Sequence, residues 1–153
     1  MSDQLEWVTY CGLHCDLCGA RARIPQRADA LHQAMDDEGW PYWGMSEPGF
    51  REFWSFLEKL RVDSGCPGCR AEGGWPGCPM RACARERGLE LCNQCPDFPC
   101  SHVEGLAARY PMLIADNHRM QEVGLERWLG EQKERVVRGV VYADTRNSTD
   151  ETS

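Results

Sequence analysis

Seven of the ten cysteines of this chain lie within residues 66–100, and the other three lie together near the N-terminus, at positions 11, 15 and 18. Three close pairs have two residues between their cysteines: Cys15/Cys18, Cys66/Cys69 and Cys92/Cys95. This spacing lets one turn of backbone direct two sulfurs at a common point, as a tetrahedral metal ion requires. The sequence therefore predicts that bound metal holds this region together.

The segment around Cys66 and Cys69 is not expected to form regular secondary structure. Residues 65–79 hold five Gly and three Pro, which favour turns over helices and strands. The apolar share of 42% in 153 residues suffices for one domain with a modest core. Metal binding would supply the order that apolar packing cannot supply here.

The net charge and the expected cellular compartment restrict what the protein can bind and what its cysteines can do. The net charge of −7 argues against nucleic acid or an acidic membrane, both of which need a basic face. The first ten residues lack a basic and apolar signal segment, and no stretch is apolar enough to span a membrane. We therefore expect a cytoplasmic protein, where dense cysteines indicate metal ligands more than disulfides. A disulfide framework and free or catalytic thiols remain as alternatives.

Helical patterns lie on both sides of the cysteine-rich segment. The cleanest covers 47–62, where Ser46 is the expected cap and apolar residues recur at helical spacing. The residues WPYWGM before it are expected to form a loop, serving as a core plug more than as a pocket wall. Further helices are predicted over 26–38, 79–87, 102–110, 112–123 and 125–139.

These patterns predict a small, mainly α-helical, metal-stabilised cysteine-rich domain. Irregular Gly/Pro/Cys loops would pack on about four to six helices. The single domain is expected to span 1–143, with 111–143 as a helical C-terminal extension that packs back on it. The polar residues 144–153 are expected to form a disordered tail.

Two closed metal sites are the simplest way to use the cysteines. One site would combine Cys15, Cys18, Cys66 and Cys69, and the other Cys78, Cys83, Cys92 and Cys95. Cys11 and Cys100 are then left over, and His14, between two cysteines, is an alternative ligand. All ten cysteines are candidate ligands: Cys11, Cys15, Cys18, Cys66, Cys69, Cys78, Cys83, Cys92, Cys95 and Cys100.

The identity of the metal stays open between two classes. Paired C-x2-C sites favour zinc, which is the leading prediction. The leftover cysteines extend two pairs into triplets, C-x3-C-x2-C at 11–18 and C-x2-C-x4-C at 92–100, and such triplets with a remote fourth cysteine hold iron–sulfur clusters. The first triplet also has the spacing of radical S-adenosylmethionine enzymes, but the chain is too short for their barrel. Arginines near cysteines either offset thiolate charge or form a solvated surface: Arg21, Arg23, Arg70, Arg81 and Arg85.

The motifs YCGLHCDLCGA, CPGCR and CPMRACARERGLELCNQCPDFPC resemble an uncharacterised cysteine-rich family of prokaryotic proteins, classed as a domain of unknown function. The resemblance covers about residues 9–138 and implies metal binding through the ten cysteines, but no reaction. Many members carry a further cysteine just before the position of Cys78, where this chain has Trp75, Pro76 and Gly77. A scheme with eleven ligands is therefore not available to this chain.

Three functions follow from these patterns. The leading hypothesis is a metal-stabilised interaction module with two structural zinc sites, which binds a protein partner that the sequence does not identify. The second is an iron–sulfur protein for redox or electron transfer. The third is a small zinc- or thiol-dependent enzyme, with Cys11 or Cys100 as the uncommitted sulfur. No recognised catalytic set of residues singles out a reaction, and oligomeric state is not predicted.

Overall fold

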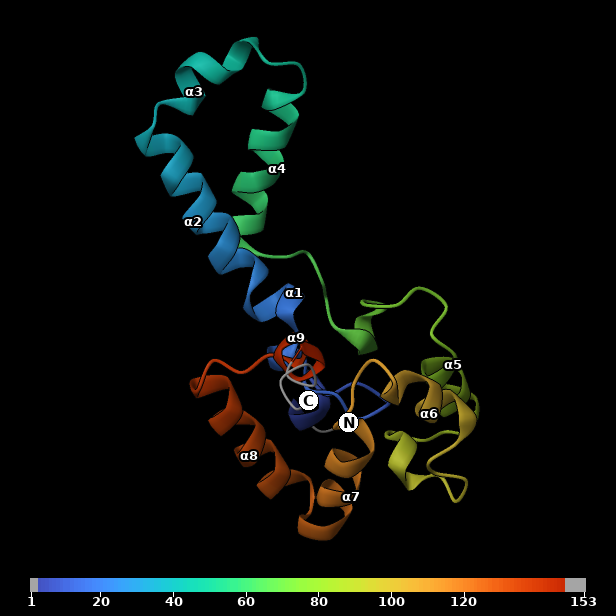
Figure 1. Cartoon of the computed structure of the whole chain (residues 1–153). Coiled ribbons are helices and arrows are strands. Elements are labelled where there is room, and N and C mark those ends of the chain that lie inside the picture. The colour runs from blue at the N-terminus through green and yellow to red at the C-terminus, as the bar shows by residue number, and fades with distance from the viewer. Residues whose placement is uncertain (1–2, 148–153) are drawn as a thin grey trace. The chain divides into compact units, whose positions relative to one another are not determined.

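The computed structural model describes residues 3–147, and the chain divides into two compact units (Figure 1). The hairpin unit is Gly19–Cys66, and the cysteine unit combines Met1–Cys18 with Pro67–Ser153. The prediction of a small, mainly α-helical protein is confirmed. Within residues 3–147, the β structure is limited to one isolated bridge between Val8 and His14. That a single domain spans 1–143 stays a prediction.

The hairpin unit is built on two helices that lie side by side, α2 (Ile24–Asp37) and α4 (Phe50–Val62) (Figure 1). A single turn of helix, α1 (Gly19–Ala22), precedes α2. Both long helices were predicted, α4 from apolar residues at helical spacing and α2 from the Pro and Gly that flank it, and their existence is confirmed. The helical spacing of the apolar residues thus gives each helix one face with which to cover the other.

Aromatic side chains form the interior of the hairpin unit. Phe50 is buried, and its ring lies 5.6 Å from that of Trp54 and 6.0 Å from that of Trp40, measured between centroids. His32 on α2 stacks on Trp54 at 4.2 Å. Such offset ring contacts add to the free energy of burial, since large apolar surfaces leave water. The hairpin unit is therefore held mainly by conventional apolar packing.

Two local predictions for the hairpin unit are wrong. The residues expected to form a loop contain a helical turn, α3 (Trp40–Trp43), followed by the 3-10 turn η3 (Gly44–Ser46). Gly39 has a φ of 75°, which ends α2 and lets the chain start again at Trp40. The cap of α4 is Gly49, with a φ of 80°, and not Ser46, because the chain turns once more before the helix begins.

The cysteine unit contains the remaining helices, and the predicted ones are again confirmed. They are α5 (Pro79–Glu86), α6 (Ser101–Ala107), α7 (Leu113–Val123) and α8 (Leu125–Val137). Short 3-10 turns lie in the cysteine-bearing segments: η2 (Cys15–Leu17), η4 (Cys69–Ala71) and η5 (Cys92–Gln94). A further turn, η1 (Asp3–Leu5), lies near the N-terminus.

The C-terminal helices pack on the N-terminal segment, as expected. Trp128 is fully buried in a cluster with Leu5, Val8, Leu91 and Met120. Residues 142–147 form the helix α9 (Tyr142–Asn147), so the first part of the expected disordered tail is helical. The rest of that tail, 148–153, lies outside the described residues. Across residues 3–147, no helix combines the length and apolarity that crossing a bilayer requires.

A buried amide joins α7 to the first cysteine. Asn117, with no exposed surface, donates from Nδ2 to the carbonyls of Cys11 and Leu113, both at 2.9 Å. Gly12 passes so close that an added Cβ would lie 2.4 Å from the Asn117 Oδ1. Its φ of 94° also favours glycine. The backbone around Cys11 is therefore fixed by contacts that do not involve its sulfur.

Candidate metal centre

A pocket of about 30 Å³ in the cysteine unit brings four cysteines together. Its lining includes Cys83, Cys92, Cys95 and Cys100. Apolar side chains complete most of the wall: Met80, Ala84, Leu89 and Phe98. Four soft sulfur donors in an apolar wall are a donor set suited to zinc or an iron–sulfur cluster.

Three local structures place these sulfurs. Cys83 lies on α5, which begins at Pro79 and ends at Glu86, and Gly88 shortly after it has a φ of 67°. Cys92 begins η5 and Cys95 caps its end, and the Cys95 amide donates to the Cys92 carbonyl at 3.0 Å. Cys100 is the N-terminal cap residue of α6. Cys83 thus sits within a helix, and the other three cysteines sit on a turn or a helix end.

The turn around Cys92 is fixed on both sides. The Cys92 amide donates to the Tyr10 carbonyl at 2.7 Å, which ties η5 to the N-terminal segment. Gln94 Oε1 accepts from the amides of Glu90 and Leu91 at 3.0 and 3.2 Å. These bonds close the N-terminal end of η5 and orient the following pair of cysteines.

Burial and neighbouring sulfurs disfavour thiolates when no metal is bound. Burial first, and then repulsion by negative charge on Cys11, Cys100, Cys83 and Cys78, raise the pKa of Cys92 to about 12. Burial is also the main cause that raises the pKa of Cys11 to about 12. A metal that binds here would displace protons, so its binding is coupled to proton release.

The set of four differs in one member from the second predicted site. Cys100, which the pairing scheme left over, lines the pocket, whereas Cys78 does not. Cys78 caps the start of α5 and, with Cys92 and Cys100, packs against the buried apolar cluster that contains Cys11, Met80, Val103 and Leu113. The Sγ of Cys11 lies 3.1 Å from the Thr9 hydroxyl. Six of the ten cysteines are thus gathered in the pocket and the apolar cluster that adjoins it.

The other predicted site draws on both units. Cys15 and Cys18 bracket η2 in the cysteine unit, with the Cys18 amide donating to the Cys15 carbonyl at 3.0 Å. Cys69 begins η4, and Cys66 is the last residue of the hairpin unit. A site formed by these four cysteines stays a prediction. His14, its alternative ligand, is buried and accepts a 3.3 Å bond at Nδ1 from the Asp16 amide.

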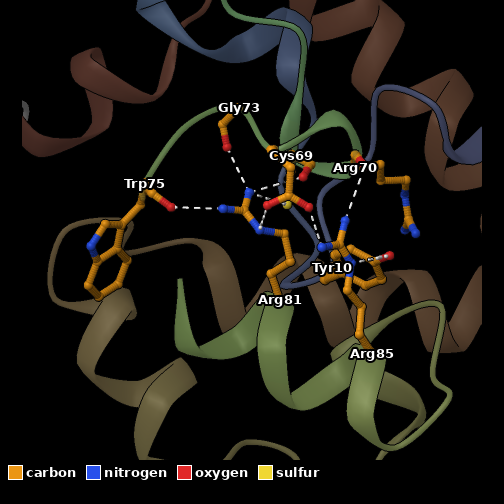
Figure 2. A network of polar contacts seen from close by, with 8 residues as sticks. Tyr10, Cys69, Arg70, Gly73, Trp75, Arg81 and Arg85 are labelled. Atoms are coloured by element: carbon orange, nitrogen blue, oxygen red, sulfur yellow. Dashed lines mark hydrogen bonds and ion pairs between the residues drawn. The ribbon is translucent and has the colours of Figure 1, made fainter. Parts of the chain in front are cut away.

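Arginine side chains order the loop that carries Cys69 (Figure 2). Arg81 is only 5% exposed, and it donates to the carbonyls of Cys69, Gly73 and Trp75 at 3.0, 2.8 and 3.1 Å. Its Nη1 also lies 4.0 Å from the Cys69 Sγ. One guanidinium thus replaces the backbone hydrogen bonds that a regular element would make.

Two further arginines flank Tyr10 beside that loop. Arg70 donates to the carbonyls of Leu5 and Val8, both at 2.8 Å, and its guanidinium lies 4.3 Å from the centroid of the Tyr10 ring. Arg85 lies 5.6 Å from the same centroid and forms an ion pair with Glu72 (Figure 2). These contacts connect the loop to the N-terminal segment without a strand or a long helix.

One pocket residue, Arg87, was missed in the sequence. Its Nη1 donates to the Cys95 Sγ and to the Asp97 Oδ2, both at 3.0 Å. The Asp97 hydrogen bond first, and then the Cys95 and Cys83 charges, raise the pKa of Arg87 above its ordinary value. The available signal was its place four residues after Cys83, on the same face of a predicted helix.

The pocket gathers the thiols without yet forming a coordination site. Among the residues that the structure describes, no three His, Cys, Asp or Glu side chains are grouped closely enough to hold a metal ion. Binding would therefore require the sulfurs to turn toward a common point. The donor set fits such a metal in chemistry, since the pocket wall offers four thiols together with the His102 imidazole and no carboxylate.

These features define a small, mainly helical, cysteine-rich protein. The chain belongs to the family described as "Protein of unknown function (DUF3795)", whose model matches residues 7–105. The match contains all ten cysteines and ends within α6, so it is shorter at its C-terminal end than the resemblance seen in the sequence. No curated protein and no solved structure matches the chain.

Proposed function

We propose that this protein is a metal-binding module in which Cys83, Cys92, Cys95 and Cys100 hold a structural metal ion, with zinc as the first candidate. The observation that carries the proposal is the gathering of these four thiols around one largely apolar pocket. Four thiolates would close a tetrahedral zinc site and leave no open position for a substrate. A structural role is therefore favoured over catalysis.

The metal would connect segments of the cysteine unit that follow the arginine-held loop. Residues 67–78 contain one short 3-10 turn, and their described contacts come largely from arginine side chains. Thiolate–metal bonds between α5, η5 and α6 would connect the segments that follow this loop. Such bonds contribute to folding because the assembled site does not exist in the unfolded chain.

An iron–sulfur cluster is the second candidate, and one observation favours it. The pocket contains the whole triplet Cys92, Cys95 and Cys100 together with the remote Cys83. A triplet with a distant fourth cysteine is a common ligand pattern for such clusters. In that case the protein would serve electron transfer, and the apolar pocket wall would limit solvent access to the cluster.

The partner proposed for the module is a protein, in a reducing compartment such as the cytoplasm. The net charge of −7 disfavours nucleic acid. Exposed aromatic side chains in the hairpin unit offer a surface for protein contact, with Tyr42 89%, Trp43 52% and Phe56 58% exposed. All ten cysteines, which lie within the described residues, are free thiols, the form that metal binding in such a compartment requires.

Elemental analysis of anaerobically purified protein tests the proposal. We expect stoichiometric zinc in a colourless protein, or iron and sulfide with absorption near ~400 nm if the second candidate holds. Cys83→Ser should lose the metal of this pocket. Ala84→Ser, which adds a hydroxyl to the same wall without removing a thiol, should retain it. Wild-type protein without zinc or iron, or a Cys83→Ser variant with unchanged metal content, would overturn the proposal.

A further inference from the structure

We propose that Arg87 is the charge partner of the four-cysteine centre and that it separates the Cys95 sulfur from the Asp97 carboxylate. The inference rests on the proposed function, because it concerns how strongly that centre retains its metal.

The geometry is a triangle of three polar atoms. The Arg87 Nη1 lies 3.0 Å from both the Cys95 Sγ and the Asp97 Oδ2. The sulfur and the carboxylate oxygen are 4.0 Å apart. One guanidinium nitrogen carries two hydrogens, so it can donate to both acceptors at once.

Metal binding makes this triangle electrostatically important. As a metal ligand Cys95 is a thiolate, and a thiolate 4.0 Å from a carboxylate is repelled by it. Arg87 is the cation that contacts both anions, and it also lines the pocket that contains the other three cysteines. It would thereby offset the negative charge that four thiolates leave on a divalent ion.

Arg85 provides a matched control on the same helix. It carries the same charge, but it contacts Glu72, Tyr10 and the Arg70 carbonyl and does not line the pocket. The side chains of Arg85 and Arg87 are comparably exposed, at 42% and 48%. A difference between their variants therefore reports contact with Cys95 and Asp97, and not a change in net charge.

The experiment measures zinc affinity by competition with a chelating dye, in the full chain. Arg87→Gln is expected to bind zinc roughly tenfold more weakly, the lower end for partners of metal ligands, because Arg87 is half exposed. Arg85→Gln should bind as the wild type does. The double variant Arg87→Gln/Asp97→Asn should recover most of the affinity, since it removes the repelling carboxylate together with the arginine.

Salt separates this role from a purely structural one. The penalty of Arg87→Gln should shrink at about 1 M salt, where charges are screened within roughly 3 Å. Equal affinities of Arg87→Gln and wild type, an equal loss in Arg85→Gln, or no recovery in the double variant would each overturn the inference. Failure of the proposed function looks different, because the wild type itself would then take up no metal, or Cys83→Ser would bind zinc as the wild type does.

Discussion

The two units of this chain obtain their order in different ways. In the hairpin unit, α2 and α4 cover each other with apolar and aromatic side chains around Phe50. In the cysteine unit, the loop that carries Cys69 is held by Arg81 and Arg70, which donate to backbone carbonyls. The contrast teaches that a glycine- and proline-rich segment can be positioned by side-chain donors where it lacks the periodicity for packing.

The largest expected effect of a single substitution is at the core of the hairpin unit. Phe50→Ala should reduce the free energy of unfolding by about 3–5 kcal/mol, because it removes a buried aromatic ring and leaves a cavity. Urea unfolding followed by helical circular dichroism measures the loss. The same loss of stability should occur with and without a chelator. A loss that depends on metal would contradict the claim that apolar packing holds the hairpin unit.

Replacing Arg81 tests whether arginine donors hold the loop that carries Cys69 in the cysteine unit. Arg81→Met should reduce the stability of the cysteine unit by about 2–3 kcal/mol, since buried carbonyls lose their donor. Arg85→Met removes a more exposed arginine from the same helix and should cost far less. Amide hydrogen exchange across residues 68–78 reports the loss. Unchanged protection in Arg81→Met would show that the loop is held by something else.

A smaller effect is expected where the backbone approaches Asn117. Gly12→Ala should cost about 1–3 kcal/mol, because the new Cβ would lie 2.4 Å from the amide oxygen and φ is 94°. Gly130→Ala, on α8 with no atom within 4 Å of the added Cβ, should instead stabilise by about 0.5–1 kcal/mol. Thermal melts of both variants test this pair. Equal melting temperatures would argue against close packing around Cys11.

The smallest effect concerns a surface ion pair between α7 and α8. The Arg119 guanidinium, through its hydrogen bonds, lowers the pKa of Glu131 below its ordinary value of 4.5. A lowered pKa stabilises the folded state above about pH 4.5, and that contribution is lost as pH falls through the folded-state value. Glu131→Gln should therefore flatten the fall in melting temperature below that pH. A variant with an unchanged acid profile would contradict this.

The sequence predicted the long helices of both units better than the ends of those helices. Apolar residues at helical spacing identified α4, Gly39 marked the end of α2, and Gly124 marked the break between α7 and α8. The start of α4 was misplaced because Ser46 is a good cap residue by type, whereas the chain uses a left-handed turn at Gly49. Local preference alone does not show which of two adjacent turns begins a helix.

Which cysteines line the pocket was harder to predict than that cysteines would gather there. Pairing cysteines by spacing selected Cys78 with Cys83, but the structure places Cys100 in the pocket and Cys78 outside it. Spacing sets which sulfurs share a turn of backbone, while the fold decides which turns meet. Arg87 was missed for the same reason, since its contact with Asp97 depends on the chain reversal at Gly88.

Amide hydrogen exchange of the full chain, with zinc bound and after removal by a chelator, tests the central claim most directly. The account predicts that metal removal strongly accelerates exchange in residues 79–107, which carry the four cysteines, while α2 and α4 keep their protection. Equal protection of residues 79–107 in the two states would contradict it, because those segments would then owe their order to the protein alone.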